Sequence, residues 1–330
     1  MTFLIPPNLL QYFIEKSRIF THTNFKNHNY LCNMEKLDGN LVSAHIKEQI
    51  KQEVIDWQEK GGKKPHLAAI LVGNNPASEA YVGHKVKSCA ELGFESTLLR
   101  FTPDITEEQL INEVKKLNDN DDVDGILVQL PLPDHISGDA VILAIDPSKD
   151  VDGFHPISQG KMMLGQPTFL PATPYGIMLM LDHYNIDVAG KHCVVIGRSN
   201  IVGTPMTILL SRNTKPGNAT VTLTHSRTKN LAEITRTADV IVAAIGKPGF
   251  VTADMVKDGV IIIDVGINRI SDATKKSGSR LVGDVDYEGC APHSSFITPV
   301  PGGVGPMTIC GLMKNTLLAA MQKAGEIVGN

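Results

Sequence analysis

Residues 192–210 read HCVVIGRSNIVGTPMTILL, and this stretch decides how the rest of the chain is interpreted. An apolar run ends at Gly197, a polar loop with Arg198 and Ser199 follows, and a helix-compatible run begins near Gly203. Strand, glycine turn and helix in this order are the parts of a dinucleotide-binding crossover. The spacing G-x-S-x-x-x-G is one residue longer than G-x-G-x-x-G, so a tight strand–helix turn without a ligand explains it equally well.

The two glycines have separate expected roles. Gly197 permits the tight turn, and Gly203 lets the helix lie close to the strand. Backbone N–H groups at the start of the helix are then expected to face an anionic pyrophosphate.

Composition narrows the class of protein. A chain of 330 residues exceeds the size at which one core usually keeps growing, so we expect two domains. A net charge of -4 with no basic stripe gives no support to a nucleic-acid partner. Five scattered cysteines indicate reduced thiols in a cytosol-like compartment, and no histidine spacing indicates a metal site. No apolar run is as long as a membrane span.

Residues 1–33 differ from the rest of the chain, because they are basic, poor in acids and without a secretory signal pattern. An organellar presequence is one explanation. We favour an upstream start codon, with the working protein beginning near Met34, because helical patterning starts only after that residue.

The pattern of apolar runs predicts an α/β fold with parallel sheets. In the first half, buried strands are expected at 67–73, 96–101 and 125–130, and helices at 41–59, 76–92, 106–117 and 137–145. Residues 146–156 are expected to be a polar loop, and Thr173 to cap a helix that runs to about Tyr184.

After the opening stretch, the second half predicts strands at 220–224, 240–245 and 260–265, with helices at 231–237 and 253–257. Residues 269–280 are charged and contain glycine, which is typical of a surface turn. A long closing helix over 306–324 is expected to return to the first domain.

Three side chains in the first half stand out as candidates for chemistry. Tyr81 and Lys85 lie four apart on one face of a helix, whereas His84 and Lys87 are expected to point elsewhere. Gln129 follows a strand, at the sheet edge where sites of α/β proteins form. A solvated lysine beside a tyrosine and a buried amide bonded to the backbone are the plainer alternatives.

Loops supply the remaining candidates. Asp152 lies in a loop before Gly153, where an ordinary Asx turn is the alternative. Residues 298–308, TPVPGGVGPMT, have an irregular backbone that is either a ligand-binding loop or a rigid linker. The segment after the strand at 220–224 has no acid, and Ser226 or Arg227 could hold a phosphate there. This feature favours NADP over NAD.

Seven motifs in order resemble the bifunctional methylenetetrahydrofolate dehydrogenase/methenyltetrahydrofolate cyclohydrolase family. They are ASEAYVGHKVKSCAELGF (77–94), DGILVQLPLP (124–133), KDVDGFHP (149–156), GRSNIVGTPM (197–206), GKPGF (246–250), DVGINR (264–269) and ITPVPGGVGPMT (297–308). The similarity extends from about Met34 to Met321, and seven collinear motifs are far more specific than one glycine pattern.

The resemblance implies a two-domain α/β enzyme with NADP as cofactor, a folate cleft between the domains and a homodimer. The implied reactions are oxidation of 5,10-methylenetetrahydrofolate to the methenyl form and hydrolysis of that product to 10-formyltetrahydrofolate. We expect residues 34–173 and 306–330 to form the folate domain and residues 174–305 the NADP domain. The expected location is cytoplasmic, or organellar if residues 1–33 are a presequence.

The resemblance also implies residue roles. Lys85 matches the catalytic lysine, Gln129 its partner, Tyr81 the tyrosine that stacks on folate, and Asp152 the aspartate that holds the pterin. The folate cleft would be lined by Pro301, Gly302 and Gly303. The cofactor would be held by Gly197, Arg198, Ser199, Gly203, Ser226, Arg227 and Ile267. Residues 1–33 are not part of the family pattern, and residues 213–219 look lengthened relative to it.

The chemistry agrees with these residues. Hydride loss leaves a delocalised cation, so that step needs positioning more than it needs an acid. Ring opening needs proton transfers, and burial beside a cationic substrate should lower the pKa of Lys85 while neutral Gln129 does not oppose this. A dehydrogenase without the hydrolase step and a non-catalytic nucleotide-binding relative are the alternatives.

Overall fold

The computed structural model describes residues 34–275 and 278–325. The expected N-terminal extension, residues 1–33, lies outside the described residues, as does the question of a presequence.

The first region is a three-stranded parallel sheet in the order β3-β2-β4. Its strand β2 reads HLAAILV and is buried from its second residue onward, as expected for the central strand of a parallel sheet. The elements are β2 (His66–Val72), α3 (Pro76–Leu92), β3 (Glu95–Phe101), α4 (Glu107–Asn118), β4 (Gly125–Val128) and α5 (Gly138–Ala144). Each expected strand and helix of this half is present.

Local capping explains where these helices begin. Asn75 accepts hydrogen bonds from the N–H groups of Ala77 and Ser78, and Pro76 occupies the first turn of α3. At α4, the Thr106 side chain accepts from the N–H of Gln109 while the Gln109 side chain accepts from the N–H of Thr106. These two reciprocal bonds form a capping box at the start of α4.

The second region is a six-stranded sheet in the order β1-β11-β8-β7-β5-β6, and all of its pairings are parallel. Strand β5 has β6 on one side and β7 on the other, so the strand order reverses there, as in doubly wound nucleotide-binding sheets. The elements are β5 (His192–Ile196), α8 (Gly203–Ser211), β6 (Thr220–Thr224), α9 (Leu231–Thr235), β7 (Val240–Ala243), η1 (Ala253–Met255), β8 (Val260–Asp264), α10 (Tyr287–Cys290), η2 (Ala291–His293) and β11 (Ser294–Ile297). The predicted fold class, two α/β regions with a Rossmann-like second one, is confirmed.

The edge strand of the larger sheet comes from the opposite end of the chain. Strand β1 (Glu35–Lys36) pairs in parallel with β11, and the N–H of Leu37 donates to the carbonyl of Ile297. The sequence placed these first residues with the smaller sheet. Two residues are too short a strand to leave a period-two pattern, so only the pairing reveals them.

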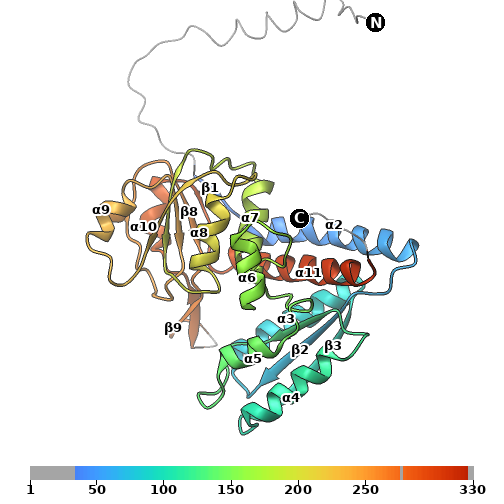
Figure 1. Ribbon diagram of the computed structural model, residues 1–330. Helices are drawn as coiled ribbons and strands as arrows, with labels where there is room; N and C mark the ends of the chain where they lie inside the picture. The colour runs from blue at the N-terminus through green and yellow to red at the C-terminus, as the bar shows by residue number, and fades with distance from the viewer. Residues whose placement is uncertain (1–33, 276–277, 326–330) are drawn as a thin grey trace, which may run out of the picture. The chain divides into compact units, whose positions relative to one another are not determined.

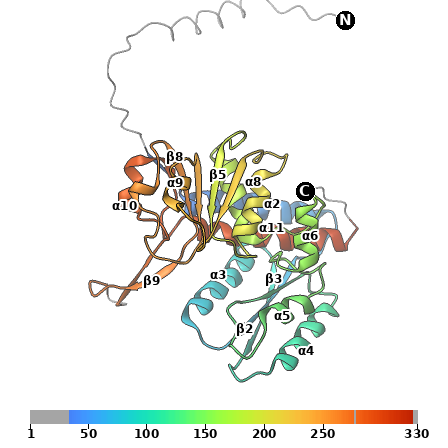
Figure 2. The same cartoon turned by 60° about the vertical axis from the view of Figure 1, so that its left-hand side comes forward.

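Three long helices pack together beside the sheets: α2 (Gly39–Glu59), α7 (Ala172–His183) and α11 (Val304–Lys323). Figures 1 and 2 show α2 and α11 running side by side. A side chain at Gly176 would collide with the backbone of Met307, and one at Gly311 with the carbonyl of Ala172. Glycine therefore sets the close approach of α7 and α11.

Two local expectations were wrong, and one helix was not predicted. Thr173 does not cap α7, because the helix already begins at Ala172 and the Thr173 hydroxyl lies 3.0 Å from that of Thr308 on α11. Residues 269–280 are more than a turn, since β9 (Asn268–Ser271) and β10 (Ser279–Val282) form an antiparallel hairpin. The chain after the polar loop at 146–156 enters α6 (Pro156–Met163), which the sequence did not predict.

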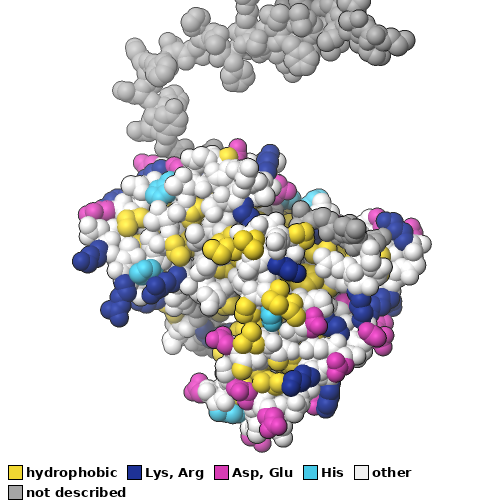
Figure 3. Space-filling model, viewed as in Figure 1, with side chains coloured by type: hydrophobic (Ala, Val, Ile, Leu, Met, Phe, Trp, Pro, Cys, Tyr) yellow, Lys and Arg dark blue, Asp and Glu magenta, His cyan; other side chains and the backbone are white. Residues whose placement is uncertain are grey.

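The surface carries charges of both signs together with some apolar side chains. Acidic and basic side chains are both spread over the face drawn in Figure 3, and hydrophobic side chains gather near its middle. Met163 and Leu164, at the end of α6, are 72% and 73% exposed. No helix in the described ranges has the length and apolar character needed to cross a membrane.

Candidate active site and cofactor cleft

Lys85 and Gln129 meet at the carboxyl edge of the smaller sheet. Lys85 lies on α3, which follows β2, and Gln129 directly follows β4. The Lys85 Nζ donates to the Gln129 Oε1 at 3.0 Å, and the lysine is 7% exposed. The Gln129 Nε2 donates to the Leu130 carbonyl at 2.7 Å, which directs the amide oxygen toward the lysine. The structure therefore brings the two predicted residues together.

Burial and a neighbouring acid act on the lysine in opposite directions. Desolvation lowers the pKa of Lys85 from its usual range, and the charge of Asp152 partly opposes that change. Burial likewise raises the pKa of Asp152, and Lys85 opposes it. Because burial is the larger influence and the neutral Gln129 adds no charge, the Lys85 amine is easier to deprotonate than that of an exposed lysine.

The loop that carries Asp152 is held from several sides. Asp150, 1% exposed, accepts from the Ser158 hydroxyl at 2.7 Å and from the His155 N–H at 2.9 Å. Buried Asn315 on α11 donates to the carbonyls of Val151 and Leu170, each at 2.8 Å. The turn at Asp152 is therefore more than a free Asx turn, because α11 fixes it against the chain that enters α7.

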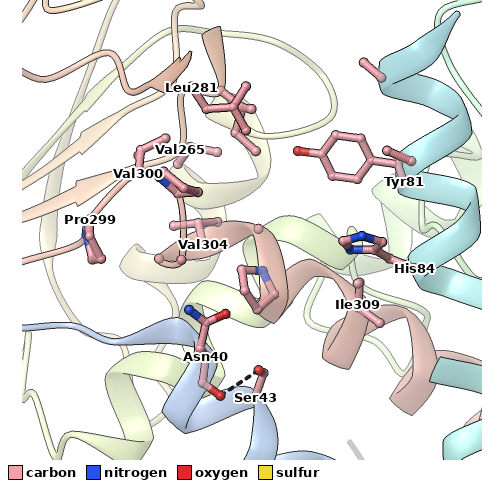
Figure 4. Close-up of a pocket in the computed structure, with 18 of the residues that line it drawn as sticks. Asn40, Ser43, Tyr81, His84, Val265, Leu281, Pro299, Val300, Val304 and Ile309 are labelled. Carbon is pink, nitrogen blue, oxygen red and sulfur yellow. Dashed lines mark hydrogen bonds between the residues drawn. The ribbon is translucent and has the colours of Figure 1, made fainter. Parts of the chain in front are cut away.

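A cavity of about 770 Å³ lies beside this group, between α2, α3, the segment after β8 and the 299–306 loop. Tyr81 extends from α3 into the cavity, as Figure 4 shows, and burial raises the pKa of its hydroxyl. His84 and Lys87 also line the cavity, so the expectation that they point elsewhere was wrong. Residues three apart share a helix face as well as residues four apart.

The predicted folate loop forms another wall of the same cavity. Pro301, Gly302 and Gly303 line it, and α11 begins directly after them at Val304. A side chain at Gly39 on α2 would collide with the carbonyl of Gly303, and Gly302 has a φ of 98°. The loop is therefore held against α2 by contacts that only glycine permits.

Lys85, Gln129 and Asp152 are not among the residues that line this cavity within the described ranges, whereas Tyr81 is. Additional lining residues that the sequence did not single out are Asn40, Ser43, Lys47, Val265 and Leu281. Their types carry no chemical signal in the sequence, and only the packing of α2, the segment after β8 and the β9–β10 hairpin places them there.

The two glycines of the opening motif behave as expected. Gly197 has a φ of 114°, and a side chain there would collide with the carbonyl of Ala244 at the end of β7. A side chain at Gly203 would collide with the carbonyl of Gly197. Both positions therefore need glycine for close backbone contact between the turn, α8 and β7.

Ser199 changes the interpretation of the helix start. Its hydroxyl accepts from the N–H groups of Val202 at 3.2 Å and Gly203 at 3.3 Å. These two N–H groups are therefore bonded within the loop, which corrects the expectation that they face a pyrophosphate. Arg198, next to it, is exposed.

The turn after β6 presents two exposed side chains. The turn is closed on itself, since the N–H of His225 donates to the Thr228 hydroxyl at 2.9 Å and the N–H of Thr228 donates to the His225 carbonyl at 2.8 Å. Ser226 and Arg227 are exposed, and no side-chain partner of the Arg227 guanidinium occurs among the described residues. Ile267, after β8, is 42% exposed and lines the cavity.

Two family models match most of the chain. The catalytic-domain model of tetrahydrofolate dehydrogenase/cyclohydrolase matches residues 37–152, and the NAD(P)-binding-domain model of the same family matches residues 171–324. This chain belongs to the tetrahydrofolate dehydrogenase/cyclohydrolase family. The resemblance inferred from the seven motifs is confirmed.

Relatives of the family are similar over nearly their whole length. The chain is 59% identical over 290 residues to the bifunctional protein FolD of Cytophaga hutchinsonii, which covers 88% of this chain and 100% of the relative. It is 58% identical over 293 residues to that of Flavobacterium johnsoniae, with 89% and 99% covered.

Solved structures of the family have the same fold. The bifunctional dehydrogenase/cyclohydrolase from Campylobacter jejuni aligns with a TM-score of 0.81 and 49% identity, covering 88% of this chain and 99% of that one. The enzyme from Trypanosoma brucei, solved with NADP cofactor and an inhibitor, aligns with a TM-score of 0.83 and 35% identity, covering 89% and 99%.

No group of three or more His, Cys, Asp or Glu side chains in residues 34–275 and 278–325 is placed to hold a metal ion. The four cysteines in those ranges are buried and unpaired, and burial raises the pKa of Cys89 and Cys193 to about 12.

Proposed function

We propose that this chain is a bifunctional one-carbon folate enzyme. It oxidises 5,10-methylenetetrahydrofolate to 5,10-methenyltetrahydrofolate with NADP and then hydrolyses that product to 10-formyltetrahydrofolate. The observation that carries the proposal is the buried Lys85–Gln129 pair, 3.0 Å apart, in a chain that matches both domains of the family.

Folate binding is assigned to the cavity and its neighbours. The Tyr81 ring stacks on the folate and faces the loop that carries Pro299 and Val300, and Pro301, Gly302 and Gly303 of the same loop also line the cavity. Asp152 holds the pterin ring, since its loop is fixed by Asn315 and its carboxylate lies within electrostatic reach of Lys85. Positioning of this kind is the main requirement of the hydride step, because the substrate's own nitrogen lone pair expels the hydride.

The residues around β5 fit a dinucleotide. Gly197 and Gly203 form the close-packed turn between β5 and α8 at the switch point of the sheet, and the predicted contacts extend to exposed Arg198 and Ser199. Exposed Ser226 and Arg227 suit a phosphate on the adenosine ribose, since the turn offers no carboxylate for a free hydroxyl. Ile267 extends this surface toward the cavity. The chemistry that NADP supplies when bound is acceptance of a hydride.

Ring opening is assigned to Lys85. Its lowered pKa allows the amine to take a proton from the attacking water and return one to the departing nitrogen. Gln129 holds the Nζ in place without adding a negative charge that would keep it protonated.

Two alternatives have a direct test. A dehydrogenase without the hydrolase step would form NADPH and let the methenyl product accumulate, whereas a non-catalytic relative would form no NADPH. The measurement is the absorbance of NADPH and of methenyltetrahydrofolate in one reaction with the purified chain. Formation of NADPH with only transient methenyl absorbance is expected, and lasting accumulation would refute the second activity.

We also propose a cytoplasmic homodimer that binds neither nucleic acid nor membranes. Residues 34–173 and 306–330 form the folate domain, except that β1 joins the sheet of the NADP domain, and residues 174–305 form the rest of the NADP domain. A net charge of -4 supports the absence of a nucleic-acid partner, and the lack of a cysteine pairing pattern supports the cytoplasmic location. Light scattering on the purified chain should give twice the mass of one chain, and a monomer mass would contradict the dimer.

A further inference from the structure

Two buried carboxylates outside the residues assigned above lie near the cofactor side of the cleft. Asp264 ends β8 and is 3% exposed, and Asp284 follows β10 and is 0% exposed. No ion pair to a Lys, Arg or His side chain joins either of them within the described residues. Two like charges so close together are costly in a protein interior unless hydrogen bonds compensate them.

Hydrogen bonds from the chain that follows β7 stabilise the charge of Asp284. Its Oδ2 accepts from the N–H of Ile245 at 2.7 Å and of Gly246 at 2.9 Å, and its Oδ1 accepts from the Asn268 Nδ2 at 2.8 Å. The preceding Ala244 carbonyl is the atom that a side chain at Gly197 would strike. Asp284 therefore fixes the peptide groups that face the glycine turn of β5, at the switch point of the sheet.

Hydrogen bonds from the backbone around Asp284 stabilise the charge of Asp264. Its Oδ1 accepts from the N–H groups of Gly266 and Asp284, and its Oδ2 from that of Val285, all at 2.9 Å. Its own N–H donates to the Thr298 hydroxyl at 2.7 Å, where the loop that reaches Gly303 begins. Asp264 therefore connects the cofactor side of the cleft to the folate loop.

No space is left for these contacts to shift. A side chain at Gly266 would collide with the Asp284 carboxylate, and one at Gly283 with the Asp264 carboxylate. Among the described residues, the Asp264 carboxylate accepts from backbone N–H groups alone, and the Asp284 carboxylate accepts from two of them, so neither carboxylate can turn without leaving a backbone N–H unsatisfied.

We propose that Asp264 and Asp284 form a positioning pair. The pair holds the peptide groups of Ile245 and Gly246 in a fixed position relative to the loop after Thr298, and this position determines the affinity for the dinucleotide. This inference rests on the proposed function. Neither side chain is a catalytic residue, since each acts through the backbone that it holds.

The test is Asp284→Ala in the full chain. Loss of the three accepted hydrogen bonds frees the segment after β7, so the Kd and the KM for NADP should rise about tenfold or more, as small misplacements in a binding site do. Hydrolysis of added methenyltetrahydrofolate, measured without NADP, should stay within about twofold of the unmutated rate, because Lys85 and Gln129 lie on the other sheet.

Asp284→Asn should restore most of the affinity. Its amide oxygen can accept from Ile245 and Gly246, and the Asn268 amide can turn to accept from the new NH2 group. Asp284→Asn combined with Asn268→Ala removes that compensation and should raise the Kd again. The comparison of Asp284→Asn with the double variant also serves as the test if Asp284→Ala does not fold.

Hydrogen–deuterium exchange on the protein without cofactor gives a readout that does not depend on activity. Exchange over residues 244–250 should be faster in Asp284→Ala. The matched control is Asp286→Ala, two residues along, where an exposed aspartate caps the short helix α10. That variant should leave both the exchange and the NADP Kd unchanged.

Three results would overturn the inference: an unchanged Kd for NADP in Asp284→Ala, a parallel loss of both activities, or equal effects in Asp286→Ala. Failure of the proposed function would look different. The unmutated protein would then form no NADPH from methylenetetrahydrofolate, while the exchange rates and the NADP Kd would still decide the role of Asp284.

Discussion

At the scale of single residues, the site depends on how its environment changes a lysine. Lys85 is buried, it donates to an uncharged amide, and the charge of Asp152 opposes the lowering of its pKa by burial. Desolvation is the larger of the two effects, so the amine is easier to deprotonate than lysine in water. A side chain with this property is suited to proton transfer in ring opening and adds little to hydride transfer.

Lys85→Met should separate the two activities. The methionine keeps most of the apolar stem but removes the amine, so cyclohydrolase activity should fall by about 100-fold or more, as for a lost acid–base group. Dehydrogenase activity should fall less, and methenyltetrahydrofolate should accumulate. NADPH formation and methenyl decay are measured on the same preparation.

Gln129→Glu should act in the same direction, because a carboxylate at 3.0 Å would keep the lysine protonated. Lys116→Met is the matched control, since this lysine is exposed on α4 and pairs with Glu113 at 2.7 Å. Equal loss of both activities in Lys85→Met would show that the lysine positions folate and does not handle protons.

Arg227→Ala should weaken the preference for NADP over NAD. The exposed guanidinium has the charge and the donors to bind a phosphate, so its loss should raise the KM for NADP about tenfold and leave that for NAD nearly unchanged. Arg236→Ala is the control, because that guanidinium is already bonded to the Asp254 carbonyl at 2.7 Å. Equal use of both cofactors by the unmutated protein would contradict the assignment.

At the scale of elements, the crossing of α7 and α11 connects the folate loop to the chain that leaves the smaller sheet. Gly176 and Gly311 let the two helices approach until backbone touches backbone. Asn315, one turn further along α11, holds the loop of Asp152. A change in the distance between α7 and α11 would therefore displace both the folate loop before α11 and the loop that carries Asp152.

Gly176→Ala should lower the free energy of unfolding by about 1–3 kcal/mol, since the new methyl group would overlap the backbone of Met307. Denaturant unfolding measures the change. Gly160→Ala on α6 is the control, because no atom lies within 4 Å of a side chain there, and it should be neutral or stabilise by up to about 1 kcal/mol. Equal effects of the two substitutions would show that the crossing is not close-packed.

At the scale of the whole molecule, burial of acids changes how stability depends on pH. Desolvation raises the pKa of Asp150 to about 6 and that of Asp264 to about 6, in spite of their hydrogen bonds. A raised pKa in the folded state means that protonation favours folding. The resulting stabilisation is present below the unfolded pKa near 4 and is lost as pH rises through about 6.

Asp150→Asn should reveal this contribution. As pH falls from about 7 to about 4, the free energy of unfolding of the unmutated protein should rise relative to the variant by about 3 kcal/mol, from a shift of about two pKa units. Asp146→Asn should show the opposite trend, because the Ser148 hydroxyl lowers the pKa of Asp146. A pH-independent difference for Asp150→Asn would contradict the raised pKa.

The sequence by itself determined most strands and helices of the two sheets, and it singled out Lys85 and Gln129 as candidates for chemistry. Continuous apolar runs predict buried parallel strands, because this signal depends on neighbouring residues alone. The resemblance supplied roles for Lys85 and Gln129, and the structure places the two in contact.

Only the tertiary structure decided which residues meet across the chain. The pairing of β1 with β11, the cavity contacts of His84 and Lys87, and the carboxylate pair of Asp264 and Asp284 join segments that leave no shared local pattern. Ser199 shows the same limit in one loop, since its residue type suits either a phosphate contact or the observed bond to the start of α8. Long-range packing chooses between such alternatives, because a hydrogen bond depends on where two groups lie in space and not on their spacing along the chain.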